Sequence, residues 1–141
     1  MMVFKNVKIS DYNLVLDEIF KKNKSHKLFL LNGEIGSGKT TLIKSFLKRL
    51  LVKRGVSSPT FNIINDYSND NNELFFHFDL YRIKSKNELI EIGFDEYINS
   101  GNYCFIEWPE IVLNKINLKY LDIEIRCLDE DKREIIINET D

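Results

Sequence analysis

The sequence is short of several features that mark particular classes of protein. Its two cysteines, Cys104 and Cys127, lie far apart and in no metal-binding or redox spacing, so we expect two buried, reduced thiols. Its apolar runs are far shorter than the roughly 18 residues that a membrane-spanning helix requires. Residues 1–10 also lack the apolar core of a signal peptide. These absences predict a cytoplasmic protein with no membrane contact.

No charge of one sign dominates the chain either. Lys and Arg number 20 against 22 Asp and Glu, which gives a net charge of −2. This balance excludes a basic field over the whole molecule, so contact with nucleic acid would require a local patch. The sequence does contain enough hydrophobic residues to form a core. Its 141 residues, 43% of them hydrophobic, predict a single folded domain over residues 1–141.

Hydrophobic spacing in the first part of the chain predicts a helix, a strand and a second helix. Apolar residues recur at helical spacing over residues 12–20 and 43–51, with Ser10 as the N-cap of the first helix and Gly55 as the end of the second. Between these helices, Leu28–Leu31 is a continuous apolar run that is too short for a helix. Such a run is typical of a strand buried on both faces of a parallel sheet.

The rest of the chain changes to the spacing of strands and short helices. The patterns predict a hairpin at 61–67 and 73–80, short helices at 85–93 and 94–98, a buried strand at 103–106, and antiparallel strands at 121–127 and 135–137. Together they predict an α/β fold, with a mixed, mainly parallel sheet flanked by helices and by antiparallel hairpin strands.

One motif carries a specific chemical prediction. Residues 33–40 fit the pattern G-x-x-x-x-G-K-[ST] at every fixed position, between a buried strand and an amphipathic helix. The glycines let backbone N–H groups surround phosphate oxygens, Lys39 is placed to reach the β and γ phosphates, and the Thr40 hydroxyl can bind Mg²⁺. The motif therefore predicts a single P-loop NTPase domain. The residues expected to bind the nucleotide here are Gly33, Glu34, Ile35, Gly36, Ser37, Gly38, Lys39, Thr40 and Thr41.

Two acidic residues at predicted strand ends are candidates for the metal or for the attacking water. Asp79 follows one apolar run and Glu107 follows another, and either carboxylate would lie near the loop if its strand lies beside Leu28–Leu31. His77 is two residues before Asp79 and shares its sheet face, which favours a packing or orienting role over direct catalysis. Trp108, next to Glu107, is either a simple anchor or part of the site.

The helix after the loop is basic, and other features narrow the class of NTPase. Its cations are Lys44, Lys48, Arg49, Lys53 and Arg54, which form either a solvated face or a patch for RNA or an acidic partner. The stretch 114–117 lacks the aspartate of the N-K-x-D motif of GTPases. Residues 84–101 are too short for the large lid of a small-molecule kinase, so that activity is possible but unsupported.

Several blocks resemble one family in order along the chain. They are residues 33–41, Ser58-Pro59-Thr60-Phe61, His77-Phe78-Asp79-Leu80-Tyr81-Arg82, the Ile-Gly-Phe-Asp-Glu-Tyr run within 88–97, and Glu107-Trp108-Pro109-Glu110. Over roughly residues 10–140 the sequence is similar to the TsaE (YjeE) family, the ATPase of bacterial tRNA threonylcarbamoyladenosine biosynthesis. The P-loop alone would not identify this family, but the other blocks in this order are specific to it.

The resemblance implies ATP and Mg²⁺ as cofactors and the TsaB–TsaD pair as partner. It implies that Thr40 and Glu107 hold Mg²⁺, that Asp79 supports the metal or a water, and that Thr60 lies on a switch-like loop near the γ-phosphate. Trp108 would flank the nucleotide. The catalytic set is therefore expected to be Lys39, Thr60, Asp79 and Glu107, with tRNA met indirectly or through the basic helix Lys44–Arg54.

Three functional interpretations remain open from the sequence. The first is an ATPase component whose hydrolysis permits repeated turnover of the TsaB–TsaD machinery. The second is an assembly clamp for which ATP binding matters and hydrolysis does not, and the third is a small-molecule kinase. No arginine is clearly placed to stabilise transition-state charge, although Arg82 is a candidate, so we expect hydrolysis to be slow until partners are present.

Overall fold

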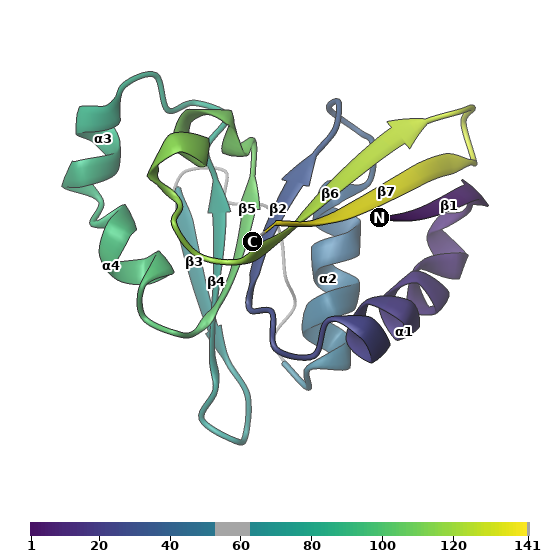
Figure 1. Ribbon diagram of the computed structural model, residues 1–141, viewed down its shortest axis with the longest axis horizontal. Coiled ribbons are helices and arrows are strands. Elements are labelled where there is room, and N and C mark those ends of the chain that lie inside the picture. The colour runs from purple at the N-terminus through teal and green to yellow at the C-terminus, as the bar shows by residue number, and fades with distance from the viewer. Residues whose placement is uncertain (53–62, 141) are drawn as a thin grey trace.

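The structure of the protein, a computed structural model, describes residues 1–52 and 63–140. Within these residues the chain forms a sheet of seven strands in the order β1-β7-β6-β2-β5-β4-β3 (Figure 1). The strands are β1 (Met2–Val7), β2 (Leu28–Asn32), β3 (Ile64–Ser68), β4 (Leu74–Asp79), β5 (Tyr103–Glu107), β6 (Tyr120–Cys127) and β7 (Arg133–Thr140). The helices are α1 (Tyr12–Lys22), α2 (Lys39–Arg49), α3 (Lys86–Glu91) and α4 (Phe94–Ile98), with 3₁₀ helices η1 (Ile9–Asp11) and η2 (Pro109–Lys115).

The centre of the sheet is parallel and its margins are antiparallel. Strand β2 pairs in parallel with β5 on one side and with β6 on the other, and β4 pairs in parallel with β5. Strands β7, β1 and β3 join the margins through antiparallel pairs. The predicted α/β fold with its mixed sheet is confirmed, and β3 with β4 forms the predicted hairpin.

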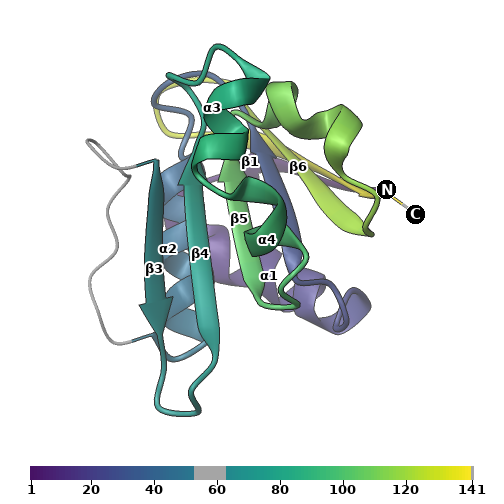
Figure 2. The ribbon, with the colours of Figure 1, turned by 90° about the vertical axis from the view of Figure 1, so that its left-hand side faces the viewer.

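Helices cover both faces of the sheet. Helices α1 and α2 lie on one face, whereas α3, α4 and η2 lie on the other (Figures 1 and 2). In β2, Phe29 and Leu31 join the core beneath α1 and α2, while Leu28 and Leu30 join the core on the opposite side. This two-sided burial is the reason why every residue from Leu28 to Leu31 is apolar.

An aromatic cluster fixes α2 against the sheet and so positions the loop before that helix. The buried Phe46 ring lies 4.9 Å from Phe29, 5.3 Å from Phe105 and 5.7 Å from Phe20, measured between ring centroids. Burying a side chain of this size contributes roughly 2–3 kcal/mol. Because Phe29 is in β2 and Phe105 is in β5, the cluster ties the helix to the two central strands.

The structure corrects both predicted helix boundaries. Asp11, not Ser10, is the N-cap of α1, because the turn η1 intervenes between β1 and the helix. Helix α2 ends at Arg49 rather than running to Gly55, since Leu51 takes a left-handed φ of 66°. The side chain of Asn69, in the β3–β4 connection, donates to the Leu50 carbonyl at 2.9 Å and so satisfies one of the terminal acceptors of α2.

Two further differences concern the ends of the sheet. Strand β1 was not predicted from the sequence, and it pairs with β7 at one edge. Cys104 is buried as expected, but Cys127 is exposed, so the prediction of two buried thiols is wrong for Cys127. The alternation of β6 predicted an inward Cys127, but the residue lies at the end of the strand, opposite Arg133 and beyond the last buried residue, Ile125.

Candidate nucleotide-binding site

Residues 33–38 form the loop between the end of β2 and the start of α2, at the upper edge of the sheet in Figure 1. Gly38 is the N-cap of α2 and has a left-handed φ of 106°. A Cβ on Gly38 would collide with the Tyr12 hydroxyl, and a Cβ on Gly33 would lie 2.6 Å from Ser37 Oγ and 2.7 Å from the Ile125 carbonyl oxygen. Both glycines are therefore required by the close approach of neighbouring groups.

The loop is supported from behind by residues that the sequence did not indicate. Arg133 of β7 is buried and donates from Nε to the Ser37 carbonyl at 2.6 Å. The Tyr12 hydroxyl is buried beside Gly38 and has no hydrogen-bond partner within the described residues. Arg133 is far from the loop along the chain, and its neighbours in the sequence predict only the start of a strand. No local pattern could therefore have identified its hydrogen bond to the Ser37 carbonyl.

Lys39, the invariant lysine of the motif pattern, is folded back onto the loop. Its Nζ donates to the Gly33 carbonyl at 2.5 Å and lies 3.7 Å from the centroid of the Trp108 ring, a cation–π contact. Burial lowers the pKa of Lys39 below its ordinary value, although the carboxylates of Glu107 and Asp79 act in the opposite direction. The lysine thus stands at the inner end of the loop with its charge held by a carbonyl and a ring.

A chain of three side chains, of which His77 and Glu107 are buried and Thr40 is half-buried, lies beside Lys39. Thr40 donates from Oγ1 to Glu107 Oε1 at 3.0 Å, and His77 Nε2 lies 2.5 Å from Glu107 Oε2. His77 is 0% exposed and Glu107 is 3% exposed. Burial opposes the charge of Glu107, but the hydrogen bonds from His77 and Thr40 outweigh it and hold the pKa of Glu107 below its ordinary value. Glu107 is therefore a buried carboxylate that stays charged.

Asp79 ends the strand next to the one that Glu107 ends. The two residues are directly paired in the parallel ladder of β4 and β5, which puts both carboxylates at the loop edge of the sheet. Burial raises the pKa of Asp79, although the Tyr81 backbone N–H donates to Oδ1 at 3.1 Å and acts in the opposite direction. The two carboxylates thus differ, since Glu107 is enclosed and Asp79 is partly open to solvent.

The oxygen donors at this edge fit Mg²⁺. The Thr40 hydroxyl and the Glu107 carboxylate are hard oxygen ligands within hydrogen-bond distance of each other. No group of three or more His, Cys, Asp or Glu side chains within the described residues could hold a metal by itself. Such a sparse set is typical of Mg²⁺, which protein sites bind through one or two side chains together with phosphates and water.

Trp108 closes one side of the site through an unusual backbone conformation. It has a left-handed φ of 59° and is the N-cap of η2, with Pro109 following. Its ring packs against Tyr81 at 4.9 Å between centroids and against the Lys39 ammonium. A left-handed conformation costs a non-glycine residue about 1–2 kcal/mol, so the surrounding packing must impose it.

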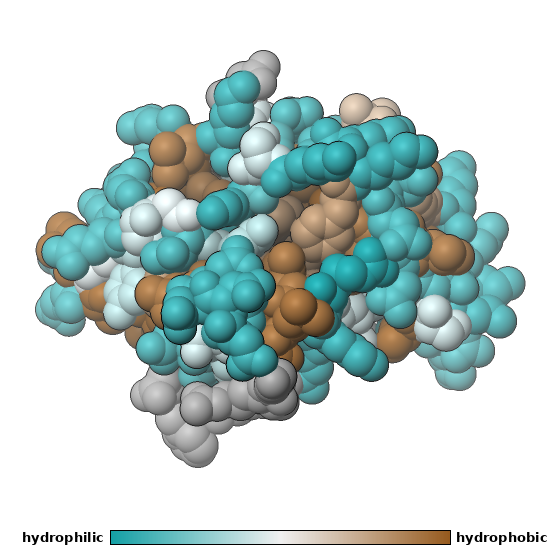
Figure 3. All heavy atoms as spheres, turned by 90° about the horizontal axis from the view of Figure 1, so that it is seen from below, coloured by the Kyte–Doolittle hydropathy of each residue, from teal (hydrophilic) through white to brown (hydrophobic). Residues whose placement is uncertain are grey.

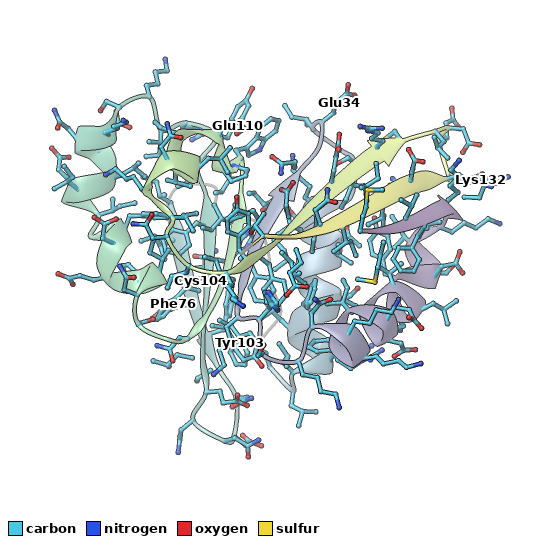
Figure 4. All side chains as sticks on the ribbon, in the orientation of Figure 1. Glu34, Phe76, Tyr103, Cys104, Glu110 and Lys132 are labelled. Atoms are coloured by element: carbon cyan, nitrogen blue, oxygen red, sulfur yellow. The ribbon has the colours of Figure 1, made fainter. Side chains whose placement is uncertain are left out.

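The structure therefore brings together most of the predicted site residues. Lys39, Thr40, Asp79, Glu107 and Trp108 meet at one edge of the sheet, although their roles in binding and catalysis stay predictions. Thr60 lies outside the described residues. Of the other loop residues, Ile35 and Glu34 point to solvent, as Figure 4 shows for Glu34, and Ser37 is buried.

The predicted basic helix is shorter and less basic than expected. Lys44, Lys48 and Arg49 are exposed on α2, whereas Lys53 and Arg54 lie outside the described residues. Arg49 is not a free cation, because its Nη1 lies 2.6 Å from Asp17 Oδ1 of α1. No helix in residues 1–52 or 63–140 is long and apolar enough to cross a membrane.

Comparison with known proteins gives a consistent result. The sequence model of the family described as "Threonylcarbamoyl adenosine biosynthesis protein TsaE" matches residues 8–135. Proteins named "tRNA threonylcarbamoyladenosine biosynthesis protein TsaE" are 37% identical in Rickettsia typhi, over 82% of this chain and 81% of the relative, and 37% identical in Aquifex aeolicus, over 86% and 84%. The relative of that name in Bacillus subtilis is 37% identical over 79% of this chain and 69% of its own length.

A solved structure agrees with the sequence comparisons. The structure titled "Crystal structure of Bacillus subtilus YdiB" superposes with a TM-score of 0.71 over 99% of this chain and 84% of that chain, at 27% identity. The fold, with its glycine-rich loop between β2 and α2, is that of a P-loop NTPase domain. The family suggested by the ordered sequence blocks is confirmed: the chain belongs to the TsaE family.

Proposed function

We propose that this chain is a Mg²⁺-dependent ATPase of tRNA threonylcarbamoyladenosine biosynthesis, the process after which its relatives are named. We propose further that it acts with a TsaB–TsaD pair in the cytoplasm. The observation that carries the ATPase part is the contact of Thr40 and His77 with the same buried carboxylate, Glu107. A purely structural loop would not need a charged carboxylate held at this depth, because burying such a charge without a partner costs several kcal/mol.

The loop residues supply the binding step. Backbone N–H groups of residues 33–38 and the first turn of α2 would surround the phosphates, because the positive end of a helix favours anions. Lys39 would exchange its contacts with the Gly33 carbonyl and the Trp108 ring for the β and γ phosphates.

The side chains at the loop edge of the sheet would hold the metal and orient the attacking water. Thr40 and Glu107 would hold Mg²⁺, which would offset the negative charge that develops on the phosphates. His77 contacts Glu107 Oε2, and the Thr40 hydroxyl lies within hydrogen-bond distance of both Glu107 oxygens, so these two residues would orient the carboxylate. Asp79, which is more open to solvent, would support the metal or the attacking water.

The isolated chain is expected to turn over slowly. Arg133, the arginine that contacts the loop, is directed at the Ser37 and Asp131 carbonyls behind it rather than at the phosphate side. Arg82, the candidate from the sequence, is exposed in the connection after β4. A positioned arginine contributes roughly 10³- to 10⁵-fold in related phosphoryl transfers, so a partner that completed the charge stabilisation would accelerate hydrolysis strongly.

The test combines ATP hydrolysis with tRNA modification. Glu107→Gln keeps the shape of the side chain and removes its charge, so we expect ATP to bind but hydrolysis and repeated tRNA modification to fail. Modification that continues at the normal rate with Glu107→Gln would support the assembly clamp instead. Transfer of the γ-phosphate to a metabolite rather than to water would support the kinase. Equal ATP turnover with and without TsaB–TsaD would contradict the proposed stimulation.

A further inference from the structure

A second charged feature lies at the edge of the sheet opposite the P-loop. The segment 21–27 reads Lys-Lys-Asn-Lys-Ser-His-Lys, with four lysines in seven residues, and connects the end of α1 to the start of β2. The P-loop follows the other end of β2, so the two features are separated by the length of that strand (Figure 1). Figure 4 marks the two edges, since Tyr103 lies beside the lysine segment and Glu34 lies in the P-loop.

The segment presents its lysines to solvent and its other long side chains to the protein. Lys21, Lys22, Lys24 and Lys27 are exposed, whereas Asn23 and His26 are buried. Figure 3 looks onto this edge, where hydrophilic side chains cover much of the surface between smaller hydrophobic areas. The seven residues include no apolar side chain.

Its backbone forms a turn beside Glu139 of β7. The Asn23 side chain donates from Nδ2 to Glu139 Oε2 at 3.4 Å, and His26 Nε2 lies 3.3 Å from Glu139 Oε1 but has no hydrogen-bond partner within the described residues. The Asn23 backbone N–H donates to the Ile19 carbonyl at 2.8 Å and its carbonyl accepts from the His26 N–H at 3.2 Å. The turn that carries the lysines is therefore supported by two backbone hydrogen bonds and by the Asn23 side chain.

The four lysines of this segment outnumber the carboxylates that the structure places against it, Glu18 and Glu139. Lys22 forms an exposed pair with Glu18 at 3.9 Å, which is worth little in water. Within the described part of the chain, Lys21, Lys24 and Lys27 form no ion pair, and Lys27 instead lies 5.3 Å above the Tyr103 ring. By contrast, Arg49 on the predicted basic helix is neutralised by Asp17. Within residues 1–52 and 63–140, Lys21, Lys24 and Lys27 are thus less compensated by carboxylates than Arg49 on α2.

We propose that Lys21, Lys22, Lys24 and Lys27, the lysine segment, contact the phosphate backbone of RNA. The identity of that RNA as a tRNA rests on the proposed function. Lysine ammoniums are point charges that contact phosphates without reading sequence. The Tyr103 ring is stacked on Phe75 at 5.1 Å and covered by Lys27, so it does not offer a face to a base. RNA fits better than a lipid surface, because a run of lysines without apolar side chains supplies only one of the two signals that stable membrane anchoring requires.

The test measures binding of a labelled tRNA by fluorescence anisotropy over a range of KCl concentrations. The variant carries Lys21→Gln, Lys22→Gln, Lys24→Gln and Lys27→Gln. A matched control removes the same number of exposed charges elsewhere, at Lys5, Lys8, Lys84 and Lys86, and so leaves the basic helix α2 unchanged. We expect the variant to bind about tenfold or more weakly and the slope of log K against log[KCl] to become shallower by roughly 3, since each phosphate contact contributes about 0.7–0.9.

Several results would overturn the proposal. One is a dissociation constant for tRNA weaker than about 0.1 mM for the unchanged protein at physiological salt, which is the weak limit of non-specific binding. Another is a loss of tRNA affinity in the control variant equal to that in the lysine variant. Binding to vesicles containing phosphatidylserine with none to tRNA would assign the segment to membranes. The quadruple variant should keep ATP binding, since the P-loop is at the other edge. The anisotropy measurement needs neither ATP nor TsaB–TsaD, so its outcome is separable from failure of the proposed function.

Discussion

The contact between His77 and Glu107 leads to a quantitative prediction for His77→Phe. Phenylalanine has a similar size and suits the buried position, but it cannot hydrogen-bond to Glu107 Oε2. Leaving a buried polar group without its partner costs about 1–3 kcal/mol, and more when the group is charged, as the Glu107 carboxylate is. Because Thr40 still donates to Oε1, we expect a loss of about 3 kcal/mol of the free energy of unfolding and not more.

Urea unfolding followed by far-ultraviolet circular dichroism would measure this loss. With a slope of about 2 kcal/mol per molar urea for a domain of this size, 3 kcal/mol corresponds to a midpoint lower by about 1.5 M. Circular dichroism is preferred to fluorescence because Trp108 lies in the altered site. The slope itself should not change, since the same surface is exposed on unfolding.

The matched control is the double variant His77→Phe with Glu107→Leu. Replacing both polar partners by apolar side chains removes the unpaired buried charge, so the double variant should be more stable than His77→Phe alone. A midpoint shift of less than about 0.3 M for His77→Phe would refute the reasoning, as would a double variant that loses the sum of the two single effects. Either result would mean that Glu107 does not depend on His77 for its buried charge.

Three further predictions concern other parts of the molecule. Trp108 is the one tryptophan of the chain, and its ring contacts Lys39. Binding of ATP with Mg²⁺ should therefore change the tryptophan fluorescence. An unchanged spectrum at saturating ATP would show that Lys39 stays on the ring. The exposed Cys127 should react rapidly with a disulfide reagent at pH 8, whereas Cys104 should react only on unfolding. Burial raises the pKa of Cys104 to about 12, so almost no thiolate forms at that pH. Two rapidly reacting thiols would contradict this prediction. Leu51→Gly should raise the free energy of unfolding, measured in urea, by about 0.5 kcal/mol, because Leu51 is 65% exposed and has a left-handed backbone. A lower free energy of unfolding would mean that the Leu51 side chain stabilises the fold through its contacts.

The P-loop and the two carboxylates were predictable because their signals are local. The glycines and Lys39 lie within one short motif, and parallel strands necessarily bring their carboxyl ends to one edge, which is where Asp79 and Glu107 lie. The shared face of His77 and Asp79 follows from the period of a strand. Sequence reasoning therefore located the members of the site before their contacts were known.

Other parts depended on tertiary contacts that no local pattern contains. Arg133 supports Ser37 only because β7 passes behind the loop, and Lys39 meets Trp108 only because Trp108 takes a left-handed conformation. Helix α2 ends early where Asn69 of a distant connection meets its last turn. The lysine segment was not singled out from the sequence, because its exposure and its position beside Glu139 depend on the fold.

The central claim is that ATP hydrolysis at Glu107 sustains repeated modification of tRNA. The most direct measurement is the amount of threonylcarbamoyladenosine formed per TsaB–TsaD pair, over several turnovers, with the unchanged chain, with Glu107→Gln and with no chain added. We expect the amount of product to exceed one equivalent per TsaB–TsaD pair only with the unchanged chain and ATP. Equal product in all three reactions would contradict it.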